Sequence, residues 1–420
     1  MRKKLKQLER DVSNRLNKYP AEKAVAKKVY TAPFRIWGRT AKNSVWKVDK
    51  TEIGEPGKQS FFGYYDLWPE NDDGLLLSHQ ATACTSRAPD PNVPIEVVVF
   101  PPDAYSKPLL TRHTVAYNWQ QGSRLQWIDN DRFIYNDFDP SRNKYVARMV
   151  SINTFETETL ALPVQCLINS QSYLAINYQR LALLRPDYGY FNLDPKSVDL
   201  NELDHDGVWK YEIGRNRHQL LYSLRNIVMA SGVCMDQTMT KHKVNHLLMS
   251  PDKLRFAMIH RQFAAGERSG YLLIGDIEGR PLTRLSAGPI VSHYCWMSDT
   301  ELLVFMDGES GFRYYMINTL TGHARPLMEL AGPASRDGHP TDLGNNLFVS
   351  DTYPDRFGYQ SLFLGNAVSG STEILAVLKH PWNYSGIARC ALHPRTKPGL
   401  DYGFIDSVYS GTRRQYRFQL

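Results

Sequence analysis

Four histidines recur at nearly even intervals in the second half of the chain, each where a short segment turns and continues with a β-strand pattern. They are His246, His293, His339 and His393, separated by 47, 46 and 54 residues. Imidazole is the most common metal ligand in proteins and a general base near neutral pH. Because one residue type recurs in one register, we predict that these histidines belong to a functional site.

The elements that carry them repeat at a length typical of propeller blades or solenoid units. Three earlier segments have Tyr64, Arg124 and Val164 at the equivalent position, which gives seven units. Most units continue with a second hairpin of alternating apolar and polar residues, and two hairpins supply the four strands of a blade. The sequence therefore predicts an all-β fold, a seven-bladed β-propeller over residues 41–420.

The two ends of this domain predict how the ring closes. The last unit offers only two strand-like segments after its opening segment, before the chain reaches Leu420. A spare strand pattern, SVWKVDKTEI, begins at Ser44. We expect this N-terminal strand to complete the last blade, because a closed ring leaves no exposed strand edges.

Residues 1–40 form a separate, basic segment. Residues 1–50 contain 15 Lys and Arg against 4 acidic residues, so the net charge of +7 leaves the rest of the chain at −4. Residues 2–18 predict a basic amphipathic helix with a short apolar stripe. This helix could attach weakly to an anionic membrane surface or to a partner protein, or it could simply pack on the outside of the propeller.

The sequence contains no sign of export. No apolar run with a cleavage site follows the basic N-terminus, and no segment approaches the roughly 18 apolar residues of a membrane span. The 5 cysteines are scattered and include no CxxC pair, so we expect no disulfide framework. We therefore expect a cytoplasmic protein, with a peripheral position at the inner membrane if the basic helix binds there.

The geometry of a blade brings further side chains to the face that carries the histidines. The start of the first strand and the end of the second lie side by side, so residues that end second strands should join this face. These are His79, Asp137, Asn177, His260, Asp307, Asp351 and Asp406, with Arg261 and Arg389 nearby. For the four aspartates we favour a structural role, in which they hydrogen-bond to backbone turns and connect blades. For the histidines we favour a functional one.

One unit is much longer than the others. It runs from Val164 to His246, and its surplus includes the segments RPDYGYFNLDPKSVDLNELDHDG and RNIVMASGVCMDQTMTKHKV. Long insertions in a regular scaffold are usually loops that cover or shape a site.

Several other chemistries lack their motifs. The chain has no GxSxG nucleophile elbow, no P-loop, no GxGxxG that opens a helix and no zinc-finger spacing. The charge of −4 outside the tail argues against nucleic acid as a partner.

Aromatic residues near the expected open face would suit stacking on sugar rings, although most aromatic residues of a propeller pack between blades. We assign to substrate binding Tyr65, Trp119, Gln121 and Arg124.

Five segments resemble the oligogalacturonate lyases and, more distantly, the seven-bladed lyases that act on rhamnose–glucuronate and ulvan-type glycans. They are GYYDLWPENDDG, NWQQGSRLQW, VNHLLMSPDKLRFAMIHR, DGHPTDLGNNLFVSDTYP and RCALHPR. The resemblance implies a manganese ion or similar divalent metal over the channel, with His339 and His393 as ligands and His293 or His246 as the base. It departs from the family in the last blade. There the family has a glutamine and two close histidines, whereas this chain has Arg389 and only His393.

The resemblance implies β-elimination beside the carboxylate of a uronic acid. The developing enolate needs a facing cation, for which Arg389, Arg261 or a metal could serve. The catalytic candidates are His246, His293, His260, Arg261, Arg389 and Tyr64.

Two other functions stay open. One is a non-catalytic propeller that binds a glycan or scaffolds envelope or capsular polysaccharide assembly in a bacterium, and the other is a protein-interaction propeller. The expected partner is an acidic oligosaccharide or polysaccharide.

Overall fold

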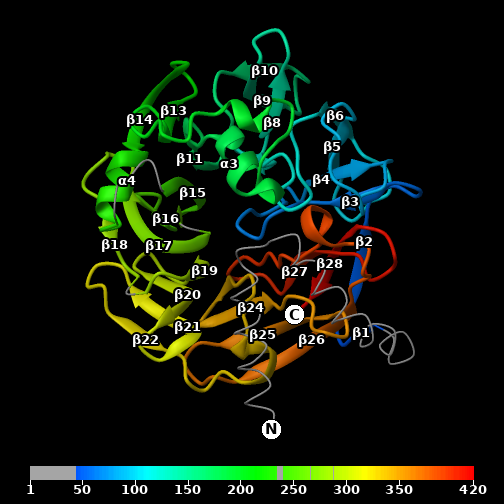
Figure 1. Ribbon diagram of the computed structural model, residues 1–420. Coiled ribbons are helices and arrows are strands. Elements are labelled where there is room, and N and C mark those ends of the chain that lie inside the picture. The colour runs from blue at the N-terminus through cyan, green and yellow to red at the C-terminus, as the bar shows by residue number, and fades with distance from the viewer. Residues whose placement is uncertain (1–43, 234–239, 265, 287) are drawn as a thin grey trace.

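The computed structural model describes residues 44–233, 240–264, 266–286 and 288–420. The whole basic segment, residues 1–40, lies outside this range, and with it the predicted helix over residues 2–18. The described residues form seven antiparallel sheets that surround a common axis as the blades of a propeller (Figure 1). The predicted fold class is therefore confirmed.

The blades follow one another in chain order. Blade 1 contains β3 (Gln59–Phe61), β4 (Leu76–Ala81), β5 (Ile95–Phe100) and β6 (Leu110–Thr114). Blade 2 contains β7 (Gln126–Trp127), β8 (Arg132–Asp139), β9 (Lys144–Ser151) and β10 (Thr157–Leu160). Blade 3 contains β11 (Cys166–Asn169), β12 (Ser172–Ala175), β13 (Gly207–Glu212) and β14 (Arg217–Ser223).

The later blades carry the four histidines. Blade 4 contains β15 (Thr240–Met249), β16 (Arg255–Ala264), β17 (Glu267–Asp276) and β18 (Thr283–Arg284). Blade 5 contains β19 (Val291–Trp296), β20 (Glu301–Gly308), β21 (Gly311–Asn318) and β22 (Ala324–Pro326). Blade 6 contains β23 (Thr341–Gly344), β24 (Leu347–Asp351), β25 (Tyr359–Asn366), β26 (Thr372–Lys379) and β1 (Val45–Trp46). Blade 7 contains β27 (Tyr402–Ser407), β28 (Arg414–Gln419) and β2 (Lys50–Ile53).

The N-terminal strand closes the ring as expected. Strand β2 pairs antiparallel with β28, with Lys50 opposite Phe418. The same stretch also gives blade 6 a fifth strand, because the chain bends between β1 and β2, and β1 pairs with β26. An isolated bridge between Arg395 and Phe404 stands where blade 7 would have a further strand.

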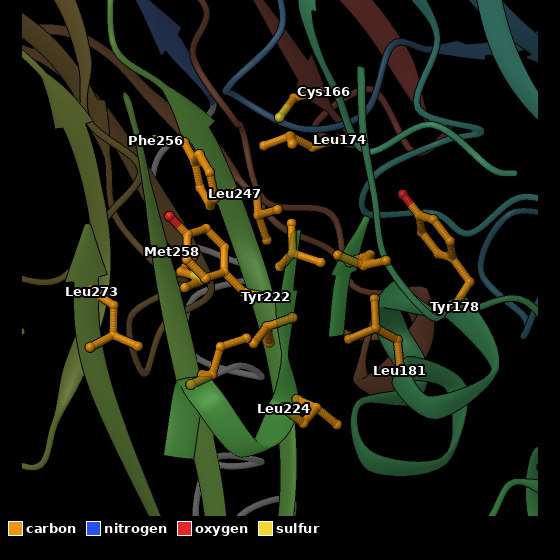
Figure 2. Close-up of a cluster of buried hydrophobic side chains, with 14 of the residues drawn as sticks. Cys166, Leu174, Tyr178, Leu181, Tyr222, Leu224, Leu247, Phe256, Met258 and Leu273 are labelled. Carbon is orange, nitrogen blue, oxygen red and sulfur yellow. The ribbon is translucent and has the colours of Figure 1, made fainter. Parts of the chain in front are cut away.

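The core consists of apolar clusters, many of them between blades, and one of them ties the insertion of blade 3 to blade 4. Figure 2 shows this cluster, in which Leu174 of β12 packs with Leu247 of β15 and Phe256 of β16. Tyr178 and Leu181 join it from α3 (Tyr178–Leu184), and Leu224 joins it from α4 (Leu224–Ala230). Each fully buried side chain of this kind contributes about 1.5 to 3 kcal/mol. None of the described helices is long and apolar enough to cross a membrane.

Candidate functional site

The four repeated histidines form one continuous row across four consecutive blades. Ring centroids are 5.5 Å apart for His246 and His293, 4.3 Å for His293 and His339, and 4.4 Å for His339 and His393. None of the four side chains is more than 5% exposed. The predicted register therefore corresponds to direct ring contact.

Irregular backbone at the innermost strands accompanies this arrangement. The pairing of β15 with β16 shifts around His246, and that of β19 with β20 shifts around His293. His246 and His393 have positive φ angles of 55° and 46°, which are uncommon outside glycine. Bulges of this kind re-aim side chains and are common beside active sites.

Two of the histidines present an unpaired ring nitrogen. Nδ1 of His339 lies 2.8 Å from Oδ1 of Asp351, and Nδ1 of His393 lies 2.9 Å from the carbonyl oxygen of Gly63. Since a carbonyl only accepts, Nδ1 of His393 donates and its Nε2 carries a free lone pair. Nε2 of both rings is buried without a hydrogen-bond partner among the described residues. Buried polar atoms without partners are rare and call for an explanation, such as a bound ligand.

His293 is oriented by a carboxylate. Its Nδ1 lies 3.1 Å from Oδ1 of Asp337, and Oδ2 of the same carboxylate accepts a hydrogen bond from the hydroxyl of Ser292. Burial lowers the pKa of His293 to about 4, and the neighbouring His339 contributes to this shift. His293 is therefore neutral at pH 7 and able to accept a proton at the nitrogen that does not face Asp337.

Two tyrosines of blade 1 line the row. The hydroxyl of Tyr64 lies 2.6 Å from Nδ1 of His246, and its ring also packs edge-on against His393. Tyr65 donates to the carbonyl of Tyr294 at 3.0 Å. Burial raises the pKa of Tyr64 well above its usual value, so this hydroxyl keeps its proton at neutral pH.

The predicted cation Arg389 has one edge of its guanidinium that forms no hydrogen bond within the described chain. It follows η5 (Gly386–Ala388), and its Cζ lies 5.2 Å from the ring centroid of Tyr353. Tyr353 in turn contacts the rings of His293 and His339. Nε and Nη2 of Arg389 are buried and have no hydrogen-bond partner within the described chain. These two atoms form the side of the fork that binds a carboxylate through two parallel hydrogen bonds.

A second group of cations lies beside His246. Lys243 and Arg261 are opposite each other on β15 and β16, and both side chains are buried. Burial, together with the charges of Arg268 and Arg185, lowers the pKa of Arg261 to about 9. Burial, with the same three arginines nearby, lowers the pKa of Lys243 far below its usual value. No described residue forms a hydrogen bond or ion pair with the side chains of Lys243, Arg261 or Arg268.

The insertion of blade 3 reaches the row at His246, which agrees with the prediction that it shapes the site. Its helix η2 (Pro186–Tyr188) lies against η5, and Tyr188 packs against Tyr64 and His246 with centroid distances of 5.7 and 5.4 Å. Part of the second surplus segment, residues 234–239, lies outside the described range. The sequence analysis did not predict Tyr188, Tyr353 or Lys243 as site residues. The only indication in the sequence was that all three lie in segments that it had noted, the surplus of the long unit and the segment that begins DGHP.

Several predicted site residues are used elsewhere in the fold. All three guanidinium nitrogens of Arg124 donate to Asp66 or to the carbonyl of Gln165. Arg124 therefore links segments of neighbouring blades. Trp119 donates to the carbonyl of Arg87 and packs on Phe61.

Two other predicted site residues, His260 and Gln121, do not belong to the histidine row. Both ring nitrogens of His260 are engaged, one by Ser231 at 2.7 Å and one by His242 at 3.1 Å. Gln121 is buried, and its backbone N–H donates to Asn118. Two of the four aspartates have the structural role that we favoured, since Asp351 and Asp406 accept backbone N–H groups from the following blade.

The donor set does not complete a metal site. Nε2 of His339 and of His393 could each donate to a divalent ion. Yet no group of three or more His, Cys, Asp and Glu side chains is arranged to hold one in the part of the chain that the structure describes. The predicted metal therefore stays a prediction, and we derive no chemical step through it.

Solved structures resemble the chain over most of its length. An oligogalacturonate lyase in complex with manganese matches with a TM-score of 0.58 and 13% identity, over 90% of this chain and 95% of that one. The oligogalacturonate lyase of Vibrio parahaemolyticus matches with a TM-score of 0.55 and 13% identity, over 90% of this chain and 98% of its own. The chain has the fold of the oligogalacturonate lyases. At this identity the likeness to those lyases establishes architecture alone. No protein-family model and no curated protein matches the sequence.

Proposed function

We propose that this protein binds a uronic-acid-containing oligosaccharide or polysaccharide and cleaves it by β-elimination. The observation that carries the proposal is the Nε and Nη2 edge of Arg389, which forms no hydrogen bond within the described chain. The guanidinium of Arg389 lies on the ring of Tyr353 and so adjoins the histidine row. A carboxylate bound there would have its developing enolate charge neutralised. Neutral His293 would be available as the base.

The chemistry balances without a redox partner. His293 takes the hydrogen alpha to the carboxylate, and the electron pair of that bond forms the double bond as the glycosidic carbon–oxygen bond breaks. Asp337 stabilises the imidazolium that forms. Tyr64 is protonated at neutral pH and hydrogen-bonded to His246, which suits it to protonate the leaving oxygen.

A non-catalytic glycan-binding propeller is the second candidate. The burial of the row, with Tyr188 packed on His246, favours it, because a substrate would need to displace this cover. The incomplete metal donor set favours it as well.

The test is ultraviolet absorbance of the conjugated double bond, recorded with a panel of uronate oligosaccharides and with manganese or a chelator. A lyase should show a rise that disappears in His293→Gln and in Arg389→Gln. The matched control is Arg225→Gln, which removes a surface guanidinium paired with Asp204. A flat trace combined with binding by calorimetry would favour the second candidate, and the absence of both would overturn the proposal.

A further inference from the structure

The insertion of blade 3 carries its own carboxylate to the guanidinium that we assign to the substrate. Asp187 lies in η2, and its Oδ2 is 3.6 Å from Nη2 of Arg389. Its Oδ1 is 3.0 Å from Nε of Arg185. Asp187 thus bridges an arginine of the insertion and an arginine of the last blade, across the face that carries the histidine row.

The contact with Arg389 is loose. A separation of 3.6 Å is too long for a hydrogen bond, and Nη2 of Arg389 accordingly has no hydrogen-bond partner among the described residues. A ligand carboxylate could instead bind Nε and Nη2 together, and such paired charge-assisted bonds are among the strongest in proteins. Asp187 therefore faces the side of the guanidinium that a ligand carboxylate would take, but holds it only through a loose ion pair.

The same helix carries the cover of the site. Tyr188 follows Asp187 directly and packs on Tyr64 and His246, while the guanidinium of Arg185 stacks on its ring at 4.9 Å. A movement that takes Asp187 away from Arg389 would therefore also carry Tyr188 away from His246.

We propose that Asp187 is a resident carboxylate that the ligand's own carboxylate displaces, and that this exchange moves Tyr188 off the histidine row. The inference rests on the proposed function, because it uses Arg389 as the ligand's anchor. It makes η2 a cover that opens for acidic saccharides and stays closed to neutral ones. Asp187 then opposes binding, whereas an ordinary binding residue supports it.

The sign of the effect of Asp187→Asn on binding is the first test. Calorimetry would compare a saturated diuronate with a neutral disaccharide of the same linkage. We expect the diuronate to bind about fivefold more tightly to the variant, the ratio typical of losing one competing ion pair. The neutral sugar should be unaffected. Asp204→Asn is the matched control, since it breaks a surface ion pair in the same insertion. Weaker or unchanged diuronate binding in Asp187→Asn would overturn the proposal.

A second measurement needs no ligand. Hydrogen exchange of residues 186–193 should be faster in Asp187→Asn than in the unchanged protein or in Asp204→Asn, because the bridge that holds η2 is gone. Adding diuronate to the unchanged protein should speed exchange in the same segment. If exchange in Asp187→Asn is unchanged, the cover does not depend on Asp187. If η2 loosens in the variant but no uronate binds either protein, the proposed function fails while the bridge itself stands.

Discussion

The hydroxyl of Tyr64 lies 2.6 Å from Nδ1 of His246, although the two residues come from blades 1 and 4. The two rings stack with a centroid distance of 5.1 Å, so the contact spans the central channel. A buried tyrosine that is hydrogen-bonded to a neutral imidazole can donate a proton without exposing a charge to solvent. This makes Tyr64 the strongest candidate for the general acid.

Tyr64→Phe should abolish most of the turnover while leaving the fold intact. Loss of a general acid costs about 10²- to 10⁴-fold in rate, and the ring that fills the channel is kept. The measurement is kcat and KM on a uronate oligosaccharide together with the midpoint of thermal unfolding. Tyr173→Phe is the control, since its hydroxyl donates to a backbone carbonyl, that of Leu162, outside the histidine row. Equal loss in both variants would point to packing as the role of Tyr64.

Asp351→Asn should destabilise the protein and disturb two histidines together. Asp351 is fully buried and accepts from the backbone and Nδ1 of His339 and from the backbone of Leu392 and His393. An amide offers one acceptor in place of two, so one set of donors loses its partner. We expect a loss of about 2 to 4 kcal/mol in the free energy of unfolding.

Denaturant unfolding, with Asp204→Asn as the surface control, measures the effect of Asp351→Asn. A change below about 0.5 kcal/mol, the range of ordinary surface substitutions, would show that the histidines hold their positions without Asp351.

The sequence predicted the histidine row because that part of the site follows the repeat. Positions that recur every 46 to 54 residues lie at equivalent places in successive blades, so His246, His293, His339 and His393 meet by symmetry. The closure by an N-terminal strand followed from the same count of strands.

The rest of the site breaks the repeat and could not be predicted in this way. The path of the insertion is set by the packing of α3 between blades, which brings Asp187 and Tyr188 over residues far away in the sequence. Arg124 and Trp119 have residue types that suit saccharide binding. Their partners, which include Asp66 and the carbonyl of Arg87, are distant along the chain and were invisible in the sequence pattern.

Folding stability should fall as the pH is lowered from about 6.5 towards 4. Burial lowers the pKa of four histidines below the ordinary value of 6.5, to about 3 for His79 and His260 and to about 4 for His242 and His293. Between pH 4 and 6.5 the unfolded chain therefore binds more protons than the folded one. Stability is then fully present above pH 6.5 and is lost on acidification.

The contribution of one of these histidines to the slope can be measured. His79→Gln should reduce the slope of the free energy of unfolding against pH by about 1.4 kcal/mol per pH unit, which is the contribution of one proton. The free energy of unfolding, measured in denaturant from pH 4.5 to 7.5, would show this. His113→Gln is the control, because His113 is exposed. An unchanged slope in His79→Gln would mean that His79 takes up its proton without unfolding.

Gly270→Ala should weaken uronate binding through Arg261 without altering any charged residue. A Cβ at Gly270 would lie 2.1 Å from Nη1 of Arg261, so the guanidinium that crosses this glycine would have to move. Because Arg261 is buried beside Lys243 and Arg185, it has little room to keep its charge at the same place. We expect about tenfold weaker binding of a diuronate, the loss typical of one charge-assisted hydrogen bond.

Gly214→Ala is the matched control for Gly270→Ala, since a Cβ there meets nothing closer than 3.5 Å. Calorimetry with the diuronate and thermal unfolding of both variants separate a binding effect from a loss of stability. Should Gly270→Ala bind the diuronate as tightly as the unchanged protein, the carboxylate would be held by Arg389 alone. The cations at β15 and β16 would then act only by keeping His246 neutral, since the charges of Arg261 and Lys243, together with burial, lower its pKa.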